Sequence, residues 1–285
     1  MAYGRVMARA GCGAVVGALL LVGCSGADAD GEGERSGPSS SGSSEPSESS
    51  GSSANASSRP VGQPSKRPGD RAITPDPARV PRTEAQARAL AEKVVAGPDT
   101  WGPGYVQRTP YLTPPGHWLV LDEGCVWQRA PRPAGVLHSL TAHSELPAGP
   151  GRGPVRVAAT VNVHRDAKGA DWDMAETLEE TLRCPDQTLR EGERVKNLWS
   201  QGRWYGRGND LADDSVFETG DYENAQFDRA YTYNWYQARY GPVTITVTSK
   251  GAKGHKDDDI DKARLEAFIA MLGRVETQLG AEVDR

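Results

Sequence analysis

The chain has 285 residues, 25% of them charged, and a formal net charge of −5. This acidic balance disfavours nucleic acids and anionic lipid surfaces as partners, because both carry dense negative charge. The sequence lacks GxSxG, HExxH and SxxK motifs and any phosphate-binding glycine loop. It therefore does not match the commonest hydrolases, zinc peptidases or nucleotide enzymes, and it indicates no cofactor.

The first 23 residues have the pattern of an export signal. Arg5 and Arg9 supply positive charge, and an apolar run follows at residues 14–22. This run is about half of the ~20 residues that span a bilayer, so it predicts a signal-peptide core rather than a membrane span. It ends in residues 21–24 (LVGC), which resemble the lipobox of bacterial lipoproteins. The alternative is an ordinary secretory signal in which Cys24 is incidental.

The lipobox resemblance implies that Cys24 carries a diacylglycerol thioether and becomes the first residue of the mature chain. Removal of residues 1–23 deletes two arginines and no acid, which takes the formal charge from −5 to −7. Met7 is an alternative start that leaves the signal pattern intact. We therefore expect a protein that is anchored by lipid to the outer face of the cytoplasmic membrane and extends into the cell wall.

Residues 24–79 predict a disordered tether behind the lipidated cysteine. Residues 25–60 contain fourteen serines, no aromatic residue and no aliphatic residue larger than alanine, and residues 61–79 add four prolines. Such a composition buries too little apolar surface to offset the entropy lost on ordering. As a flexible coil of about 55 residues the tether would reach roughly 40 Å.

The pattern of residues 80–285 predicts one α+β domain. A helix at 83–96 begins with a Thr83/Gln86 capping-box pattern and stops at Gly97-Pro98. Strands follow at 117–121, 125–129, 136–144 and 155–164, and the last alternates valines with polar residues. The next helix is expected to be capped by Asp171 and to bury Trp172, Ala175, Leu178 and Leu182.

The second half of the domain predicts four more strands and a final helix. The strands fall at 194–204, 214–222, 229–239 and 242–249, and the last two form a tight antiparallel pair around Tyr240-Gly241. The helix begins within 257–259, where carboxylates suit the positive helix end. Its expected buried residues are Ile260, Leu265, Phe268, Met271, Leu272, Val275 and Leu279. Short connections favour a largely antiparallel sheet of seven or eight strands with three helices packed on it.

Two cysteines remain in the domain after the leader and the anchor are set aside. Cys125 and Cys184 form an even pair in an oxidising compartment, which favours a disulfide. Closing a loop of about 60 residues would contribute something near 4 kcal/mol in the chain-entropy model. A metal site or a catalytic thiol is the alternative, although the domain has no CxxC motif.

Aromatic residues are concentrated in one part of the chain. Eleven of the nineteen Phe, Tyr and Trp residues lie between 199 and 240. The strand at 229–239 places Tyr231, Tyr233 and Trp235 on one face and Tyr236, with Tyr240 beyond it, on the other. One of these faces must cover the core, and the second is either buried beneath a helix or exposed as a platform for a sugar ring or an apolar ligand. We take Tyr231, Tyr233, Trp235 and Tyr236 as the candidate ligand-binding residues.

Histidines and carboxylates give weaker indications of chemistry. His138 and His143 lie five residues apart on one strand and thus on opposite faces, which is poor metal geometry. His164 is expected on a solvated polar face. His255 beside three aspartates could hold a hard cation, but an acidic helix start explains the same residues. Acid pairs such as Asp171/Asp173 and Glu176/Glu180 would support a hydrolase only if they flanked a sugar cleft. We assign no metal ligand and no catalytic residue.

The anchor, the Ser/Pro-rich tether and an α+β domain with Cys125-Val126-Trp127 together resemble actinobacterial secreted lipoproteins and, in plan, the PknH-like extracellular sensor domain. That resemblance implies a cleft that binds a ligand, with any signal relayed by an envelope protein partner. Sensor domains of that type have two disulfides, whereas this domain can make one. We expect a monomeric, non-enzymatic ligand-binding or sensor-like lipoprotein. An envelope scaffold without a small ligand and a wall-directed hydrolase are the alternatives.

Overall fold

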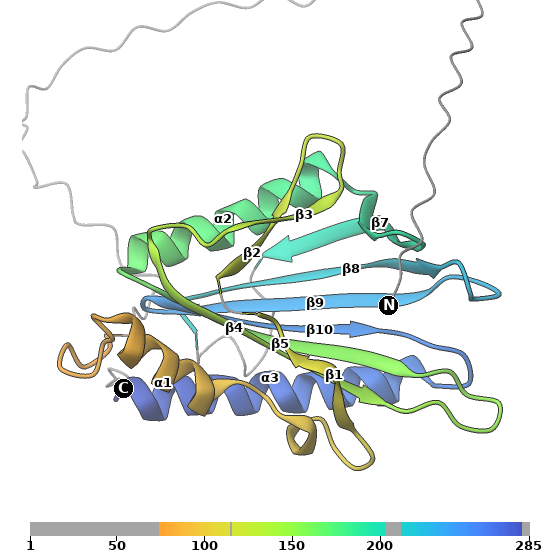
Figure 1. Ribbon diagram of the computed structural model, residues 1–285, viewed down its shortest axis with the longest axis horizontal. Coiled ribbons are helices and arrows are strands. Elements are labelled where there is room, and N and C mark those ends of the chain that lie inside the picture. The colour runs from red at the N-terminus through yellow and green to blue at the C-terminus, as the bar shows by residue number, and fades with distance from the viewer. Residues whose placement is uncertain (1–73, 115, 203–211, 281–285) are drawn as a thin grey trace, which may run out of the picture. The chain divides into compact units, whose positions relative to one another are not determined.

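The computed structural model describes residues 74–114, 116–202 and 212–280, which lie in one compact unit (Figure 1). The expected signal peptide, Cys24, and the tether up to residue 73 lie outside the described residues. Within them the chain forms an antiparallel sheet with three α-helices packed on it, which confirms the predicted α+β class. Among these described residues, none of the helices combines the length and apolarity that a membrane crossing needs.

The main sheet has eight strands in the order β1-β4-β5-β10-β9-β8-β7-β6, and every pairing in it is antiparallel. Its strands are β1 (Val106–Leu112), β4 (Val136–Leu146), β5 (Val155–His164), β6 (Gln187–Arg190), β7 (Glu193–Gly202), β8 (Asp214–Asn224), β9 (Tyr231–Tyr240) and β10 (Val243–Lys250). A separate hairpin pairs β2 (His117–Leu121) with β3 (Trp127–Pro131). The antiparallel sheet of seven or eight strands is thus confirmed.

Two strands of the sheet were not predicted, and both lie at its edges. β1 contains Pro110 and pairs with β4 only through an irregular register, while β6 has four residues. Edge strands bury neither face regularly, so they lack the alternation on which sequence analysis depends. The tight β9–β10 turn is as expected: Gly241 adopts a φ of +55°, which glycine accepts without strain.

One face of the sheet carries the hydrophobic core. Helix α1 (Glu84–Val94) packs there with the predicted capping box of Thr83 and Gln86, and α3 (Asp257–Leu279) packs beside it. Because strand side chains alternate, β5, β9 and β10 send one set of side chains into this core. All the residues predicted to be buried on the final helix are buried except Leu265, which is exposed.

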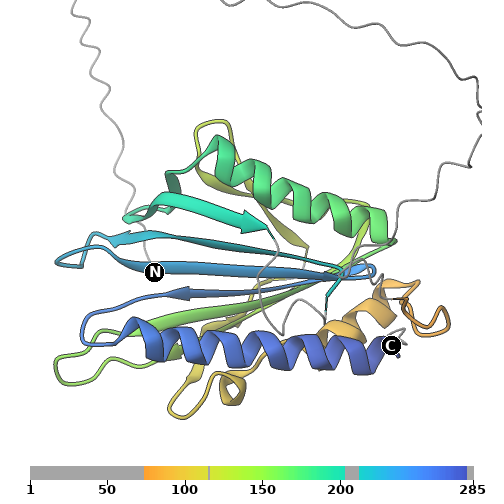
Figure 2. The ribbon, with the colours of Figure 1, turned by 180° about the vertical axis from the view of Figure 1, so that it is seen from behind.

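The opposite face is covered by helix α2 (Ala167–Arg183) and, beside it, the β2–β3 hairpin (Figures 1 and 2). Two expectations about α2 were wrong. Its N-cap is Asp166, whose side chain accepts a hydrogen bond from the Gly169 amide at 2.8 Å, so it starts one turn before Asp171. Trp172 and Leu182 are 62% and 84% exposed, because the helix turns a polar stripe toward the sheet.

Residues 74–79, which the sequence places in the tether, lie against the C-terminal end of α3. The Asp76 amide donates to the Leu279 carbonyl at 3.0 Å, and Arg79 Nη1 donates to the Thr277 carbonyl at 3.3 Å. Pro75 also lies close to Gly241 in the β9–β10 turn. The structured unit therefore begins a few residues before the expected boundary at residue 80.

Candidate functional site

Helix α2 is attached to the sheet by polar contacts four residues apart. Asp173 Oδ2 accepts from Asn162 Nδ2 at 3.1 Å and from Thr244 Oγ1 at 2.5 Å, and His164 Nε2 lies 3.2 Å from the same oxygen. One turn later Thr177 Oγ1 donates to Gln237 Oε1 at 2.6 Å.

After a further turn, the Thr181 hydroxyl donates to Glu218, whose side chain is 5% exposed. The carboxylate of Asp173 and the two threonine hydroxyls, at i, i+4 and i+8, lie on one helix face, and each meets a polar partner on the strands. Beside the buried side chains of Ala170 and Met174, the α2–sheet interface is therefore built largely from these hydrogen bonds.

A cavity of about 110 Å³ opens beside this stripe, between α2, the β2–β3 hairpin and the sheet. We call it the α2 cleft. The sheet contributes hydroxyl and amide groups, α2 contributes carboxylates, and three indoles come from β2, β3 and β9. The hydroxyl and amide groups belong to Ser139, Thr141, Thr160, Asn162, Gln237 and Thr246. The carboxylates belong to Asp173, Glu176 and Glu180, and the indoles to Trp118, Trp127 and Trp235.

Burial raises the pKa of three carboxyl groups at this interface, Glu176, Glu180 and Glu218, and the shifts of Glu180 and Glu218 are large. Burial, reinforced by the charge of Glu176, raises the pKa of Glu180 to about 7. Burial also raises the pKa of Glu218 to about 7, although the hydrogen bond from Thr181 opposes the shift. Near neutral pH both groups are therefore partly protonated and can donate as well as accept hydrogen bonds. This lowers the net charge that the carboxylates place around the cleft.

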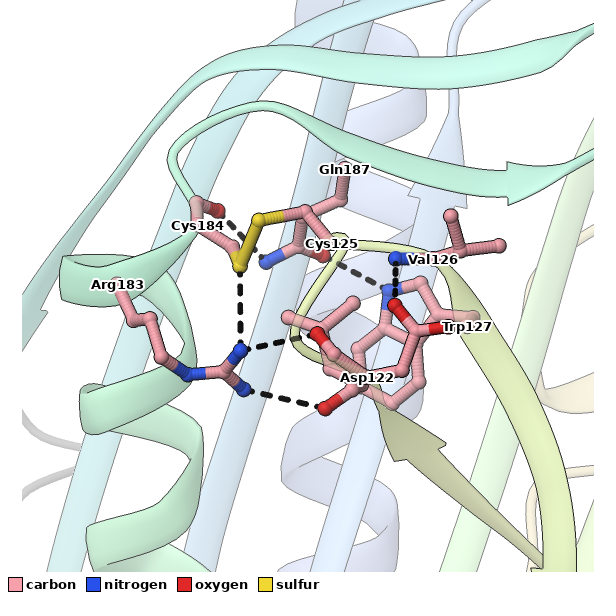
Figure 3. Close-up of a disulfide and its surroundings, with 8 residues drawn as sticks. Asp122, Cys125, Val126, Trp127, Arg183, Cys184 and Gln187 are labelled. Atoms are coloured by element: carbon pink, nitrogen blue, oxygen red, sulfur yellow. Dashed lines mark hydrogen bonds between the residues drawn. A yellow bond between two sulfur atoms is a disulfide. The ribbon is translucent and has the colours of Figure 1, made fainter.

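The predicted disulfide fixes one wall of the cleft. Cys125 and Cys184 are joined by an S–S bond of 2.08 Å, with their Cα atoms 5.6 Å apart (Figure 3). The bond ties the turn before β3 to the C-terminal end of α2. Arg183 supports the same junction, because its guanidinium donates to the backbone carbonyls of Asp122 and Leu121 at 2.9 and 3.1 Å.

Trp127, two residues after Cys125, is held by this junction. Its Nε1 donates to Gln187 Oε1 at 2.8 Å, and Gln187 Nε2 in turn donates to the Cys184 carbonyl at 3.1 Å (Figure 3). The Cys-Val-Trp motif thus has a geometric role: the disulfide and the amide together set the position of an indole in the cleft wall.

The candidate aromatic residues alternate between the two faces as predicted, but they are not an open platform. Tyr231, Tyr233, Tyr236 and Tyr240 are all buried. Tyr236 lies in the core on the α3 face, with Phe268 in edge contact at 5.7 Å between ring centroids, so it cannot reach the α2 cleft. Tyr231 donates to Asp228 at 2.9 Å, outside the cleft. Trp235 is half-buried and is the one candidate that lines the cleft.

The structure also places His164, His255 and the acidic start of α3. His164 is 3% exposed and contacts Asp173, so the expected solvated position was wrong: α2 covers that face. His255 Nε2 lies 2.9 Å from the Gly153 carbonyl, and Asp257 accepts from Thr232. In the described parts of the chain, no group of three or more His, Cys, Asp or Glu side chains is placed to hold a metal ion.

Several cleft residues were missed at the sequence level, among them Trp118, Trp127 and Gln237. A usable signal was present in β5 and β10, where threonines and Asn162 alternate strictly with buried valines and isoleucine. A strand that is apolar on one face and hydroxyl-rich on the other indicates a sheet covered on both sides by unlike layers. The hairpin indoles carry no comparable signal, because only the tertiary fold brings them to α2.

Comparison with known proteins does not identify a family for this chain. No protein-family model matches the chain, and no curated protein matches it. Among solved structures, the chain is similar to an uncharacterised protein from Mycobacterium smegmatis, the Rv0999 ortholog. The two are 16% identical with a TM-score of 0.30, and the match covers 70% of this chain and 97% of the other.

Proposed function

We propose that this chain is a lipid-anchored extracytoplasmic protein that binds, without transforming it, a neutral hydroxyl-rich ligand such as a cell-wall glycan fragment. The observation that carries the proposal is the α2 cleft, which combines three indoles with a floor of hydroxyl and amide groups. Sugar rings offer apolar C–H faces that stack on aromatic rings and hydroxyls that need hydrogen-bond partners. The cleft supplies both.

Two buried polar atoms in the cleft wall support a polar ligand. Trp235 Nε1 and His117 Nδ1 are buried, and neither has a hydrogen-bond partner within the described residues. Buried donors and acceptors are normally satisfied, so an orphaned group at a cleft is a natural contact for a ligand hydroxyl or a bridging water. The floor is already ordered for recognition, since Ser139 donates to Asn162 at 2.8 Å and the Thr141 and Thr160 hydroxyls are 2.9 Å apart.

The ligand proposal is tested by titration of the full chain in detergent with tri-N-acetylchitotriose and with a muramidase digest of peptidoglycan. Glu176→Gln should weaken binding several-fold, because Glu176 lines the cleft and makes no hydrogen bond to the described residues that the substitution would break. Glu179→Gln is the matched control, since Glu179 is exposed on the same helix and does not line the cleft. Tryptophan fluorescence reports binding, and equal affinities for the two variants would contradict the site.

A wall-directed hydrolase is the second candidate, and one observation favours it. Asp173, Glu176 and Glu180 converge on one cleft, and a carboxyl with a pKa of about 7 suits a general acid. All three, however, come from α2, while the facing sheet contributes Ser, Thr, Asn, Gln and Trp side chains. Glycosidases place carboxyls on both sides of the scissile bond. If the protein released reducing ends from peptidoglycan, and Glu180→Gln abolished that release, hydrolysis would replace binding as the proposed function.

The anchor rests on the LVGC sequence and is tested separately. Cys24→Ala should abolish incorporation of labelled lipid and release the protein from the membrane fraction. Equal retention of wild type and variant in the membrane fraction would contradict lipidation of Cys24. It would not bear on the α2 cleft. A scaffold role without a ligand is disfavoured by the concave site itself.

A further inference from the structure

A second cavity, of about 230 Å³, lies on the same face of the sheet on the other side of Trp235. We call it the basic pocket. Its charged residues come from five strands: Arg108 from β1, Arg156 from β5, Arg190 from β6, Glu193 from β7 and Lys250 from β10. Its apolar and aromatic wall is formed by Val157, Ala158, Leu189, Tyr233 and Trp235.

The single carboxylate of the pocket is already fully engaged. Glu193 is 3% exposed and pairs with Arg156 Nη1 and Lys250 Nζ, each at 2.9 Å, and with Arg190. Burial alone would raise its pKa, but the hydrogen bond from Arg190 and the charge of Lys250 outweigh burial and lower the pKa to about 2. Glu193 therefore stays ionised at all physiological pH values. Four cations around one carboxylate leave the pocket strongly positive in a chain that is acidic as a whole.

Of the four cations of the basic pocket, Arg108 takes no part in the ion pairs with Glu193. It is half-buried, and within the described parts of the chain it makes no hydrogen bond or ion pair. Burial lowers its pKa, and the like charges of Arg156 and Arg190 lower it further. Glu145 on β4 acts on Arg108 in the opposite sense but does not line the pocket. In addition, Arg156 Nε is buried and has no hydrogen-bond partner among the residues that the structure describes.

This arrangement is unfavourable for the empty protein and favourable for a bound anion. Like charges gathered in a partly buried pocket repel one another and lose hydration. A guanidinium presents a planar fork of donors that matches the two oxygens of a phosphate or a carboxylate. The rings of Tyr233 and Trp235 and the side chain of Leu189 would meet whatever apolar group the oxyanion carries.

We propose that the basic pocket binds a small organic oxyanion, a phosphate ester or a carboxylate joined to an apolar or aromatic body, with Arg108 as its principal ligand-facing cation. This site is distinct from the α2 cleft and does not depend on the glycan proposal. Trp235 lines both cavities, so the two ligands, or two parts of one ligand, would lie on opposite sides of a single indole.

His143 provides an independent reporter of occupancy. It lines the pocket, and its Nε2 lies 2.9 Å from Thr113 Oγ1. Burial, with the charges of Arg108, Lys250 and Arg190, lowers its pKa to about 4. The other titratable groups that line the pocket are Arg156, Glu193 and Tyr233. A bound anion opposes the surrounding positive charge, so it should raise the pKa of His143.

The test is calorimetric titration of the full chain in detergent, at pH 7.5 and low salt, with phenyl phosphate, benzoate and inorganic phosphate. Phenyl β-glucoside serves as the uncharged match. We expect phenyl phosphate to bind, and Arg108→Gln to weaken it about tenfold or more, because a charge-assisted bidentate contact is lost. Arg88→Gln is the matched control: Arg88 is exposed on α1, on the other face of the sheet, and should bind like wild type.

Two further arms complete the experiment. Tighter binding of dihexanoyl phosphatidic acid than of phenyl phosphate would identify a lipid headgroup as the source of the oxyanion. Tighter binding of phenyl phosphate would identify a soluble ester. Both outcomes support the site. A proton NMR titration of His143 in wild type should show a higher pKa with phenyl phosphate than without it, whatever the folding of the variants.

The inference is overturned if neither phenyl phosphate nor benzoate binds, if Arg108→Gln binds as tightly as wild type, or if the pKa of His143 does not move. Failure of chitotriose to bind would instead count against the glycan proposal alone.

Discussion

The two faces of the sheet are built from the same strands but by opposite means. On β10, Val243, Ile245 and Val247 enter the apolar core beneath α3, while Thr244, Thr246 and Thr248 face α2 or the cavities beside it. The α3 face holds the main apolar core, whereas the α2 face carries the hydrogen bonds of α2, buried carboxyls, the α2 cleft and the basic pocket. In the function proposed above, one face supplies most of the stability and the other supplies recognition.

The polar attachment of α2 explains why that helix is also held covalently. A hydrogen-bonded interface gains little net free energy, because its groups were hydrated in the unfolded chain. The Cys125–Cys184 bond and the Arg183 contacts secure the C-terminal end of α2 to the hairpin. The α3 helix, with a full apolar face, has no such link. The disulfide therefore adds a covalent tie between α2 and the hairpin that together form walls of the α2 cleft.

The largest effect should come from truncation on the α3 face. Phe268→Ala should lower the free energy of unfolding by about 3–5 kcal/mol, because it removes a buried ring and leaves a cavity. Leu182→Ala, on the exposed face of α2, should change it by less than about 0.5 kcal/mol. Urea denaturation of both variants measures the contrast. Similar losses in the two would break the distinction between the faces.

Loss of the disulfide should come next. Cys125→Ser/Cys184→Ser should destabilise the domain by about 2–4 kcal/mol, since the bond closes a loop of 59 residues. Thermal melting under oxidising and reducing conditions measures the effect, and reduction of wild type should reproduce it. Ligand affinity in the α2 cleft should also fall, because Trp127 loses its support. A double variant that melts like wild type would show that the bond is dispensable.

A smaller effect is expected within the polar interface. Thr177→Val keeps the shape of the side chain but leaves Gln237 Oε1 buried without its 2.6 Å hydrogen bond. The expected loss is about 1–3 kcal/mol. Thr248→Val, which alters a hydroxyl that makes no hydrogen bond within the described residues, is the control. If Thr177→Val proved neutral or stabilising, α2 would be held by packing rather than by its polar stripe.

The last expected effect is a dependence of stability on pH. Burial raises the pKa of Glu218 from its ordinary 4.5 to about 7, so the folded state binds a proton more tightly than the unfolded state does. Its contribution is fully present below about pH 4.5 and is lost as the pH rises through 7. Glu218→Gln removes this component, so the unfolding free energy of wild type relative to that of the variant should fall over that range. A difference between the two proteins that does not fall between pH 5 and 7.5 would contradict the shift.

The sequence predicted the parts of this fold that depend on local pattern. The capping box of α1, the alternation along β5 and β9 and the apolar stripe of α3 follow from residue spacing, and the Cys125–Cys184 bond follows from the presence of two cysteines in residues 80–285. The register of α2 did not follow, because apolar periodicity favoured Trp172 and Leu182, whereas the buried stripe is Ala170, Met174, Thr177 and Thr181. A hydroxyl stripe becomes informative only when a polar sheet face is known to oppose it.

The site depends still more on tertiary structure. Trp235 was identified from the aromatic concentration, yet its three tyrosine companions are buried and do not line the α2 cleft. The cleft depends on a hairpin folded over α2, and the basic pocket gathers residues from five strands. Each of those cations, read singly, is an ordinary surface arginine or lysine, so no linear pattern could reveal the cluster.

The central claim, that recognition belongs to the α2 face, is tested most directly by the tryptophan indole signals in a ¹H–¹⁵N spectrum of the full chain. Trp235 lies between the two cavities, and Trp101 is buried in the core on the opposite face. Titration with tri-N-acetylchitotriose or phenyl phosphate should shift the Trp235 indole signal and leave that of Trp101 in place. A Trp235 signal that stays fixed at saturating concentrations of both probes would contradict the account.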